Sequence, residues 1–304
     1  MQLKSLGKRR LSLRQQEQRI AYWMLIPTFL IVIAIVIFPV LWNLRLSFQE
    51  VSLARLGEIS LFDPDFTVKN FRKLFTDRDF LPDIRTSLIY TVGGASLSLL
   101  LGLLAALLVN TRFPGRGVVR GLFLFPFIAP VIAVTYTFRW LLEPLFGIVG
   151  YLGQASGILP RPIAFLAEEP YALITVIFFE GWRYFPFAFL FVLARLQAIP
   201  KGLYEAAEVD GATPFQRFFY VTLPQLRWVL ATIFLLRFLW LFNKFDDVFL
   251  LTGGGAGTEV LPVKLYDFAF GEFDVGAGAA VSVFLFLLLA VLLIFYFKWV
   301  LRER

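Results

Sequence analysis

Six apolar runs constrain this chain more than any other feature of its sequence. They cover residues 21–42, 87–109, 121–142, 171–194, 228–251 and 275–298. A helix needs about 20 apolar residues to cross the hydrocarbon core of a bilayer. Every backbone polar group must find its partner inside the protein at that depth, which helices achieve. The runs therefore predict an all-α polytopic membrane protein with six transmembrane helices.

The composition agrees with this class and argues against catalysis. Of the 304 residues, 59% are hydrophobic, whereas soluble domains are roughly 45–50% apolar. The chain contains no Cys and no His. It therefore lacks a thiolate nucleophile, the commonest general base and the commonest transition-metal ligand. We expect no catalytic residue, no metal site and no cofactor.

The charges of the connecting segments predict how the chain is oriented. Its net charge is +7. Membrane proteins concentrate Lys and Arg in cytoplasmic segments. We therefore interpret this charge as a signal of orientation, and we expect no nucleic-acid partner. The expected inner segments are the basic tail 1–20, 110–120, 195–227 and the tail 299–304; the expected outer loops are 43–86, 143–170 and 252–274. Both termini would then be cytoplasmic, with a five-helix core at 87–298.

The second run places small residues at intervals of four. Gly94, Ser98, Gly102 and Ala106 would share one helical face, so that another helix can approach closely. We expect this face to serve packing.

The inner segment 195–227 is the longest one and carries the most specific pattern. Glu205, Ala206, Ala207 and Glu208 suit a short helix. Gly211 permits a left-handed turn, and Pro214 suits the first turn of a second helix. Pro224 is expected to break the chain before the fifth span.

Three phenylalanines follow in the second of these helices. A membrane protein with Phe215, Phe218 and Phe219 in a cytosolic segment would bury them against a soluble partner subunit.

This pattern resembles the signature of permease subunits of binding-protein-dependent ABC importers. That signature is Glu-Ala-Ala, three residues, Gly, nine residues, then Ile-x-Leu-Pro. The matching residues here are Glu205, Ala206, Ala207, Gly211, Val221, Leu223 and Pro224, with Val in place of Ile. Asp210-Gly211-Ala212 is the usual local form. Trp228 stands where many members have a proline, which leaves the start of the fifth span open.

The resemblance implies an ABC importer type I permease fold in the cell inner membrane. Residues Glu205, Ala206, Ala207, Asp210, Gly211, Ala212 and Pro224 would form the coupling segment that docks in a cleft of an ATPase. The chain has no Gly-x-x-x-x-Gly-Lys-Ser/Thr phosphate loop, so another chain would hydrolyse ATP. The implied partners are a second permease in a heterodimer, two ATPase subunits and an extracytoplasmic solute-binding protein.

Other stretches resemble the carbohydrate branch, of the maltose and glycerol-phosphate type. They are Asn70-Phe71, Leu196–Pro200 and Leu251–Gly255, while Phe242–Asp246 is typical of the first permease of a pair. The expected cargo is a di- or oligosaccharide. Glycerol-3-phosphate or another polar solute is the alternative, although Asp246 and Asp247 disfavour an anion.

Ionisable side chains inside spans are costly and usually face a bundle interior or a cavity. Glu180 and Arg237 each lie about nine residues into their runs, at a depth of roughly 13–14 Å. Glu180 is expected to pair with Arg237 or with Arg183, its i+3 neighbour. Such a pair could serve transport or only fix helix register.

A polar cluster follows in the outer half of the fifth run. Sugars are bound by charged or amide groups beside aromatic faces. The expected substrate-path residues are Trp240, Asn243, Lys244, Asp246 and Asp247, with Ser282 and Phe286 of the sixth run as weaker candidates. Lys244 with either aspartate could equally form an outer gate.

Three other classes of protein remain as alternatives. An ion-coupled secondary transporter could use Glu180 or Asp246 but leaves the 205–224 pattern unexplained. A membrane enzyme lacks the usual catalytic residues. A scaffold would need no charges at membrane depth.

Overall fold

The computed structural model describes residues 13–58 and 66–300. Residues 1–12 of the expected basic tail 1–20, and 301–304 of the expected tail 299–304, lie outside that range. Within it the chain is helical, apart from an isolated antiparallel bridge between Ser52 and Asp274.

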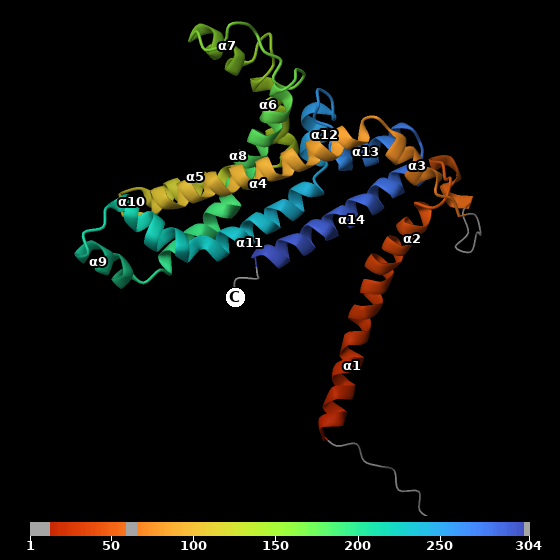
Figure 1. Ribbon diagram of the computed structural model, residues 1–304, viewed down its shortest axis with the longest axis horizontal. Coiled ribbons are helices and arrows are strands. Elements are labelled where there is room, and N and C mark those ends of the chain that lie inside the picture. Colours follow the sequence, from red (N-terminus) through yellow and green to blue (C-terminus); the bar gives the residue numbers. More distant parts are fainter. Residues whose placement is uncertain (1–12, 59–65, 301–304) are drawn as a thin grey trace, which may run out of the picture.

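The helices follow one another with short connections (Figure 1). They are α1 (Leu13–Val32), the π-helix η1 (Ile33–Ile37), α2 (Phe38–Leu46), the 3-10 helix η2 (Leu53–Glu58), α3 (Lys69–Thr76), α4 (Phe80–Asn110), α5 (Arg116–Ile128), α6 (Val131–Leu141), α7 (Ile148–Ala155), α8 (Tyr171–Gln197), α9 (Lys201–Val209), α10 (Pro214–Arg217), the π-helix η3 (Phe218–Thr222), α11 (Leu223–Phe242), α12 (Asp246–Thr252), α13 (Leu261–Tyr266), the π-helix η4 (Asp267–Gly271) and α14 (Val275–Val300).

Five of the described helical stretches are long and apolar enough to cross a membrane. They are Glu17–Leu46, Phe80–Asn110, Tyr171–Gln197, Pro214–Phe242 and Val275–Lys298. The bent pair α5 and α6 makes a sixth span if it is counted as one. The prediction of an all-α membrane protein with six spans is therefore confirmed, with the third span broken.

The break in the third span lies at two residues between its helices. α5 and α6 meet at 93° across Ala129 and Pro130. A proline lacks the N–H that would continue the helical ladder, and it disfavours helix at the residue before it. The span expected at 121–142 is therefore two helices.

The second span begins earlier than predicted. α4 starts at Phe80 instead of 87, because its first turns carry Asp83 and Arg85 and read as polar. Asp83 is buried there and pairs with Lys264 at 2.7 Å.

The fifth span differs most from its expected range of 228–251. One helical stretch runs from Pro214 to Phe242, and the separate helix α12 begins at Asp246. The polar residues between them interrupt the helix, so the apolar run of the sequence covers two elements. The connection between the fourth and fifth spans accordingly ends earlier than 227.

Pro224 does not break the chain, contrary to prediction. The π-turn η3 precedes it, and the N–H of Leu223 donates to the carbonyl of Phe218. Pro224 occupies the first turn of α11, where its missing N–H is tolerated.

The core is built where α4 packs against α8. The four small residues spaced along α4 are buried: Gly94, Ser98, Gly102 and Ala106. A Cβ atom at Gly102 would lie 2.5 Å from the Cβ of Ala188 on α8. The predicted packing face therefore lies in this contact.

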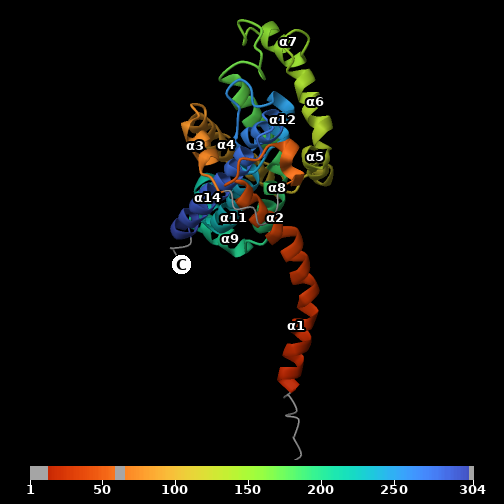
Figure 2. The same ribbon diagram turned by 90° about the vertical axis from the view of Figure 1, so that its right-hand side faces the viewer.

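The first span lies apart from the rest of the chain. Figures 1 and 2 both show α1 projecting away from the bundle of α4, α8, α11 and α14. The neighbouring α2 and the residues that follow it reach the bundle, where Leu46 of α2 and Val51 beyond it are buried with Ala279 of α14.

Candidate functional site

The segment between α8 and α11 folds into a helix, a tight turn and a second helix. Gly211 has a φ of +76° in the turn after α9, a conformation that residues with a Cβ rarely adopt. Its N–H donates to the carbonyl of Glu208 at 3.0 Å, and that of Ala212 donates to the carbonyl of Ala207 at 2.9 Å. No other atom crowds Gly211, so the need for glycine is conformational.

The second helix of this segment is capped and tied to the first. The N–H of Gln216 donates to Thr213 Oγ1 at 3.3 Å, and the N–H of Thr213 donates to Gln216 Oε1 at 2.8 Å, a complete capping box. Arg217 forms an ion pair with Glu208 across the turn. The two helices are therefore held in a fixed relation.

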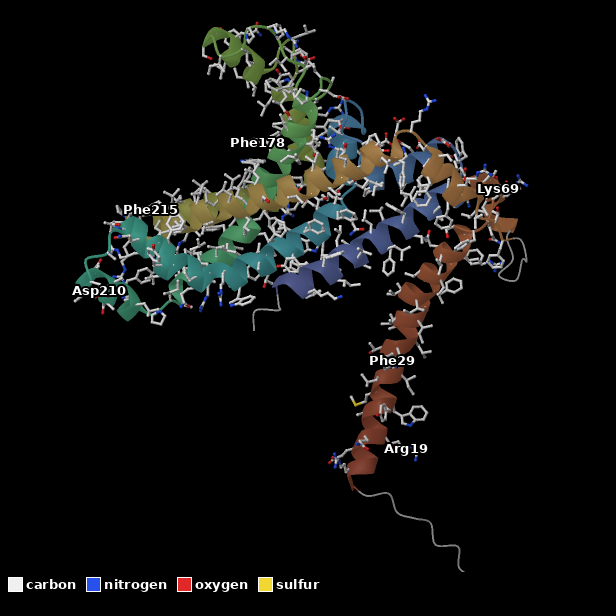
Figure 3. All side chains as sticks on the ribbon, viewed as in Figure 1. Arg19, Phe29, Lys69, Phe178, Asp210 and Phe215 are labelled. Atoms are coloured by element: carbon white, nitrogen blue, oxygen red, sulfur yellow. The ribbon has the colours of Figure 1, made fainter. Side chains whose placement is uncertain are left out.

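This segment ends in an exposed, partly apolar surface. Val209 is 89% exposed and Phe215 is 72% exposed. Figure 3 shows Asp210 and Phe215 at the end of the bundle farthest from Lys69. Of the predicted coupling residues, the exposed ones are Glu205, Ala206, Asp210, Gly211 and Pro224, and the half-buried ones are Ala207 and Ala212. Exposed apolar side chains gathered in this way mark a site for a partner.

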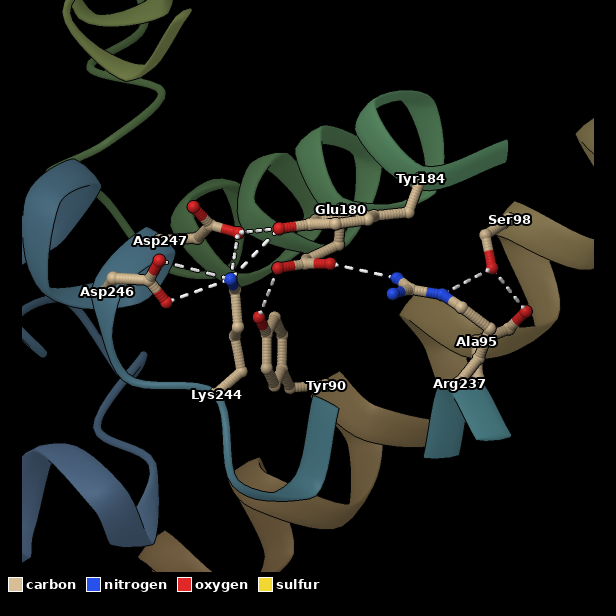
Figure 4. A network of polar contacts seen from close by, with 9 residues as sticks. All are labelled: Tyr90, Ala95, Ser98, Glu180, Tyr184, Arg237, Lys244, Asp246 and Asp247. Carbon is tan, nitrogen blue, oxygen red and sulfur yellow. Dashed lines mark hydrogen bonds and ion pairs between the residues drawn. The ribbon is translucent and has the colours of Figure 1, made fainter. Parts of the chain in front are cut away.

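A second constellation is a fully buried ion pair in the middle of the bundle. Arg237 Nη2 of α11 lies 3.0 Å from Glu180 Oε2 of α8, and neither side chain is accessible to solvent (Figure 4). Arg183 is not the partner of Glu180, because its Nη2 donates to the carbonyl of Ala129 at 3.1 Å. In α8, Glu180 therefore pairs across the bundle, whereas Arg183 bonds the backbone at the break after α5.

Two residues of α4 complete the coordination of this pair. Tyr90 donates its hydroxyl to Glu180 Oε1 at 2.9 Å, and Arg237 Nε donates to Ser98 Oγ at 3.3 Å. Ser98 in turn donates to the carbonyl of Ala95 at 2.9 Å. The ion pair therefore joins three helices.

A polar cluster at the break after α11 lies beside this ion pair. Lys244 Nζ is 2.9 Å from Asp246 Oδ1 and 3.3 Å from Asp247 Oδ2, and it donates to the hydroxyl of Tyr184 at 2.9 Å. The ring of Tyr184 also lies 4.3 Å from the Arg237 guanidinium carbon. Tyr184 is therefore the link between the cluster and the ion pair.

Not all predicted substrate-path residues join this cluster. Trp240 packs on Phe187, with ring centroids 4.9 Å apart, and Asn243 donates to the carbonyl of Leu239 at 3.0 Å. Ser282 is half-buried on α14, and Phe286 is 69% exposed on the same helix. In the described part of the chain, no hydrogen bond or ion pair connects these four residues to Lys244.

The sequence reasoning missed both tyrosines of this network. Tyr90 lies four residues before Gly94, so it shares the small-residue face of α4. That spacing was a usable signal for Tyr90. Tyr184 lies four residues after Glu180 on α8, so its spacing was a signal too, but its contact with Lys244 depends on the break after Phe242.

A further ionic cluster lies at the start of α4, at the opposite end of the bundle from α9. Lys264 Nζ of α13 is 2.8 Å from Asp77 and 2.7 Å from Asp83. Burial disfavours the charged ammonium, but hydrogen bonds to both carboxylates outweigh it and raise the pKa of Lys264. Burial alone would raise the pKa of Asp77, but the hydrogen bonds from Lys264 and from the N–H of Asp79, together with the nearby positive charges, lower the pKa of that carboxyl.

These arrangements support transport-like roles better than chemistry. Each acidic side chain of the buried network faces a cation or a hydroxyl, and in residues 13–58 and 66–300 no three acidic side chains gather as metal ligands.

Comparison with known proteins places the chain among transport proteins. A family described as binding-protein-dependent transport system inner membrane component matches residues 98–303. The chain is 35% identical over 257 residues to the inner membrane ABC transporter permease protein YcjO of Escherichia coli (strain K12), covering 84% of this chain and 85% of that protein.

Two further matches extend this likeness. The chain is 31% identical over 268 residues to the trehalose/maltose transport system permease protein MalF of Thermococcus litoralis, covering 87% and 88% of the two chains. Its fold matches a chain of a bacterial ABC transporter involved in the import of the acidic polysaccharide alginate, with a TM-score of 0.77, 22% identity and coverage of 92% and 94%. The chain therefore belongs to the family of binding-protein-dependent transport system inner membrane components.

Proposed function

We propose that the chain is the permease subunit of an ATP-binding-cassette importer that moves a di- or oligosaccharide into the cytoplasm. Family membership makes it a multi-pass inner-membrane protein. The observation that carries the proposal is the exposed helix–turn–helix at 201–217, inside the range that the family model matches. Both termini would be cytoplasmic, on the side of this segment.

The proposed mechanism is a rigid lever. A separate ATPase subunit would hold the segment from Glu205 to Ala212, together with the exposed Phe215. Closure of two ATPases on ATP would shift this segment, and the continuous helix from Pro214 to Phe242 would carry the displacement into the membrane. The chain itself would not be an enzyme, since ATP would be hydrolysed by its partners.

The polar cluster around Lys244 is the proposed point where that displacement meets the substrate path. It lies directly beyond Phe242, where the long helix ends. Lys244 would exchange its bonds to Asp246 and Asp247 for hydroxyls of a sugar, or open as a gate. Trp240 and Asn243, near the same helix end, would add an aromatic face and an amide, and Ser282 and Phe286 would lie farther along the path.

The sugar assignment draws support from the named relatives. Besides MalF, the chain is 29% identical to the galactooligosaccharides transport system permease protein GanP of Bacillus subtilis (strain 168). The proposed assembly contains a second permease, two ATPases and an extracytoplasmic solute-binding protein, with this chain as the first permease of the pair.

The coupling role is tested by two substitutions and one matched control. Gly211→Val places a β-branched residue at a φ of +76°, and Glu205→Lys reverses a charge on the exposed face of α9. In the assembled importer, we expect each to reduce ATPase stimulation by the loaded solute-binding protein more than tenfold, while membrane insertion is unchanged.

Gly202→Val is the control, since Gly202 lies in α9 with open space around its Cβ position and no positive φ. It should retain most of the stimulation. Normal sugar uptake by both test variants would contradict the coupling role. Uptake that persists without ATP and collapses with the proton or sodium gradient would favour an ion-coupled transporter instead.

A further inference from the structure

An apolar groove runs between α11 and α14 on the surface of the bundle. Its volume is about 390 Å³, and its walls include Phe234, Leu235 and Phe238 of α11. Leu292 and Tyr296 of α14 face them. The hydroxyl of Tyr296 donates to the carbonyl of Ala231 at 2.6 Å and so ties the two helices together.

Two basic residues lie beyond one end of this groove, on the same two helices. Arg227 precedes Phe234 by seven residues and Phe238 by eleven, so the three share a face of α11. Lys298 follows Phe295, another groove residue, by three and lies one turn beyond it on α14. Both Arg227 and Lys298 are exposed, and the end of α14 lies toward the end of the bundle that carries α9 (Figure 1).

The charge of this surface has one sign. The helical stretch 214–242 and the helix 275–300 contain no Asp and no Glu. The Arg227 guanidinium lies 5.0 Å from the ring centroid of Trp228, which keeps it beside an aromatic side chain. Trp and Tyr are enriched at the level of lipid headgroups. The end of the groove thus combines two cations with side chains suited to that interface.

The distance from Arg227 to the far end of the groove also fits a lipid. Arg227 and Phe238 are eleven residues apart, which is about 16 Å along a helix. One leaflet contributes about 15 Å to the hydrocarbon core of a bilayer. An acyl chain that lies along Phe234 and Phe238 would therefore bring its headgroup to Arg227 and Lys298.

We propose that this groove binds one chain of an anionic phospholipid, with its phosphate held by Arg227 and Lys298. Basic sites between transmembrane helices on the cytoplasmic side are suited to such headgroups. The assignment to the inner leaflet rests on the proposed orientation of the chain. The binding itself needs neither the ATPase nor the sugar.

Native mass spectrometry of the detergent-solubilised full chain tests this proposal with phosphatidylglycerol and phosphatidylcholine as probes. The wild type should bind phosphatidylglycerol at least tenfold more tightly than phosphatidylcholine. The double variant Arg227→Gln/Lys298→Gln should bind phosphatidylglycerol about thirtyfold less tightly than the wild type, because it loses the contributions of two basic residues near the membrane surface. Its affinity for phosphatidylcholine should change little.

The double variant Arg14→Gln/Arg112→Gln is the matched control, because it removes two exposed arginines outside the groove. It should bind both lipids as the wild type does. Leu235→Trp, which fills the groove, should weaken both lipids, and an unchanged melting temperature would establish that it folds.

Three results would overturn the proposal. They are equal affinity of the wild type for both lipids, equal loss in the two double variants, and full lipid binding by folded Leu235→Trp. Displacement of all bound phosphatidylglycerol by a co-purified second permease would also overturn it, since the groove would then be a subunit interface. None of these results depends on sugar uptake or ATPase activity, so a failure here is distinguishable from a failure of the proposed function.

Discussion

At the scale of single residues, the ion pair between Glu180 and Arg237 is the most demanding feature of the molecule. A charge withdrawn from water costs several kcal/mol unless it is paired and hydrogen-bonded. Here Tyr90 and Ser98 supply the additional hydrogen bonds, so the pair is compatible with burial. Removal of one partner leaves the other buried and unpaired.

Glu180→Gln and Arg237→Gln should therefore each destabilise the chain by about 3–5 kcal/mol. The double variant should lose clearly less than the sum, because it leaves no uncompensated charge. Unfolding in detergent by a chemical denaturant, followed by tryptophan fluorescence, measures all three. Arg183→Gln serves as the control, since Arg183 bonds a backbone carbonyl and should not couple to Glu180→Gln. Strictly additive losses for the 180/237 pair would contradict this account.

At the scale of elements, the sequence located apolar helices better than their ends. Counting residues from the ends of the apolar runs placed Glu180 and Arg237 at the same depth in the membrane. The spacing of four between small residues identified the face of α4 that packs against α8. The fifth span was misjudged because hydropathy averages over a window. Asn243 to Phe245 form a break between α11 and α12, and both of these helices contain apolar residues that the window joins. The contact of Tyr184 with Lys244 could be placed only after this break was known.

The close packing of α4 on α8 predicts which glycines tolerate a methyl group. Gly102→Ala would put a Cβ 2.5 Å from that of Ala188 and 2.7 Å from the backbone nitrogen of Phe189. We expect a loss of about 1–3 kcal/mol from this overpacking. Gly121→Ala in α5 meets nothing within 4 Å and should change stability by less than about 1 kcal/mol. Denaturant midpoints in detergent compare the two; equal effects would mean that α4 and α8 are not packed this closely.

At the scale of the whole molecule, the two ends of the bundle are built differently. The end that carries α9 presents exposed side chains on two short helices. The opposite end is fastened by Lys264 of α13, which bonds Asp77 before α4 and Asp83 within it. Lys73 of α3 adds bonds to Glu272 and Asp274 at 2.7 and 2.9 Å. A displacement introduced at α9 would therefore act against a fixed far end.

This fastening should depend on pH in a defined way. The pKa of Asp77 is lowered in the folded chain, so its contribution exists above the ordinary value of 3.8 and is lost as the pH falls further. The pKa of Lys264 is raised, so its contribution exists below 10.5 and is lost only at higher pH. Lys264→Met should thus destabilise the chain by about 3 kcal/mol at pH 7, and the difference from wild type should shrink below about pH 4.

The exposed pair of Lys69 with Glu50 offers the control Lys69→Met, which should cost little at any pH. Melting curves of the three proteins between pH 3 and 9 test this prediction. A destabilisation by Lys264→Met that stayed constant across this range would contradict it, because an ion pair must weaken once its carboxylates are protonated.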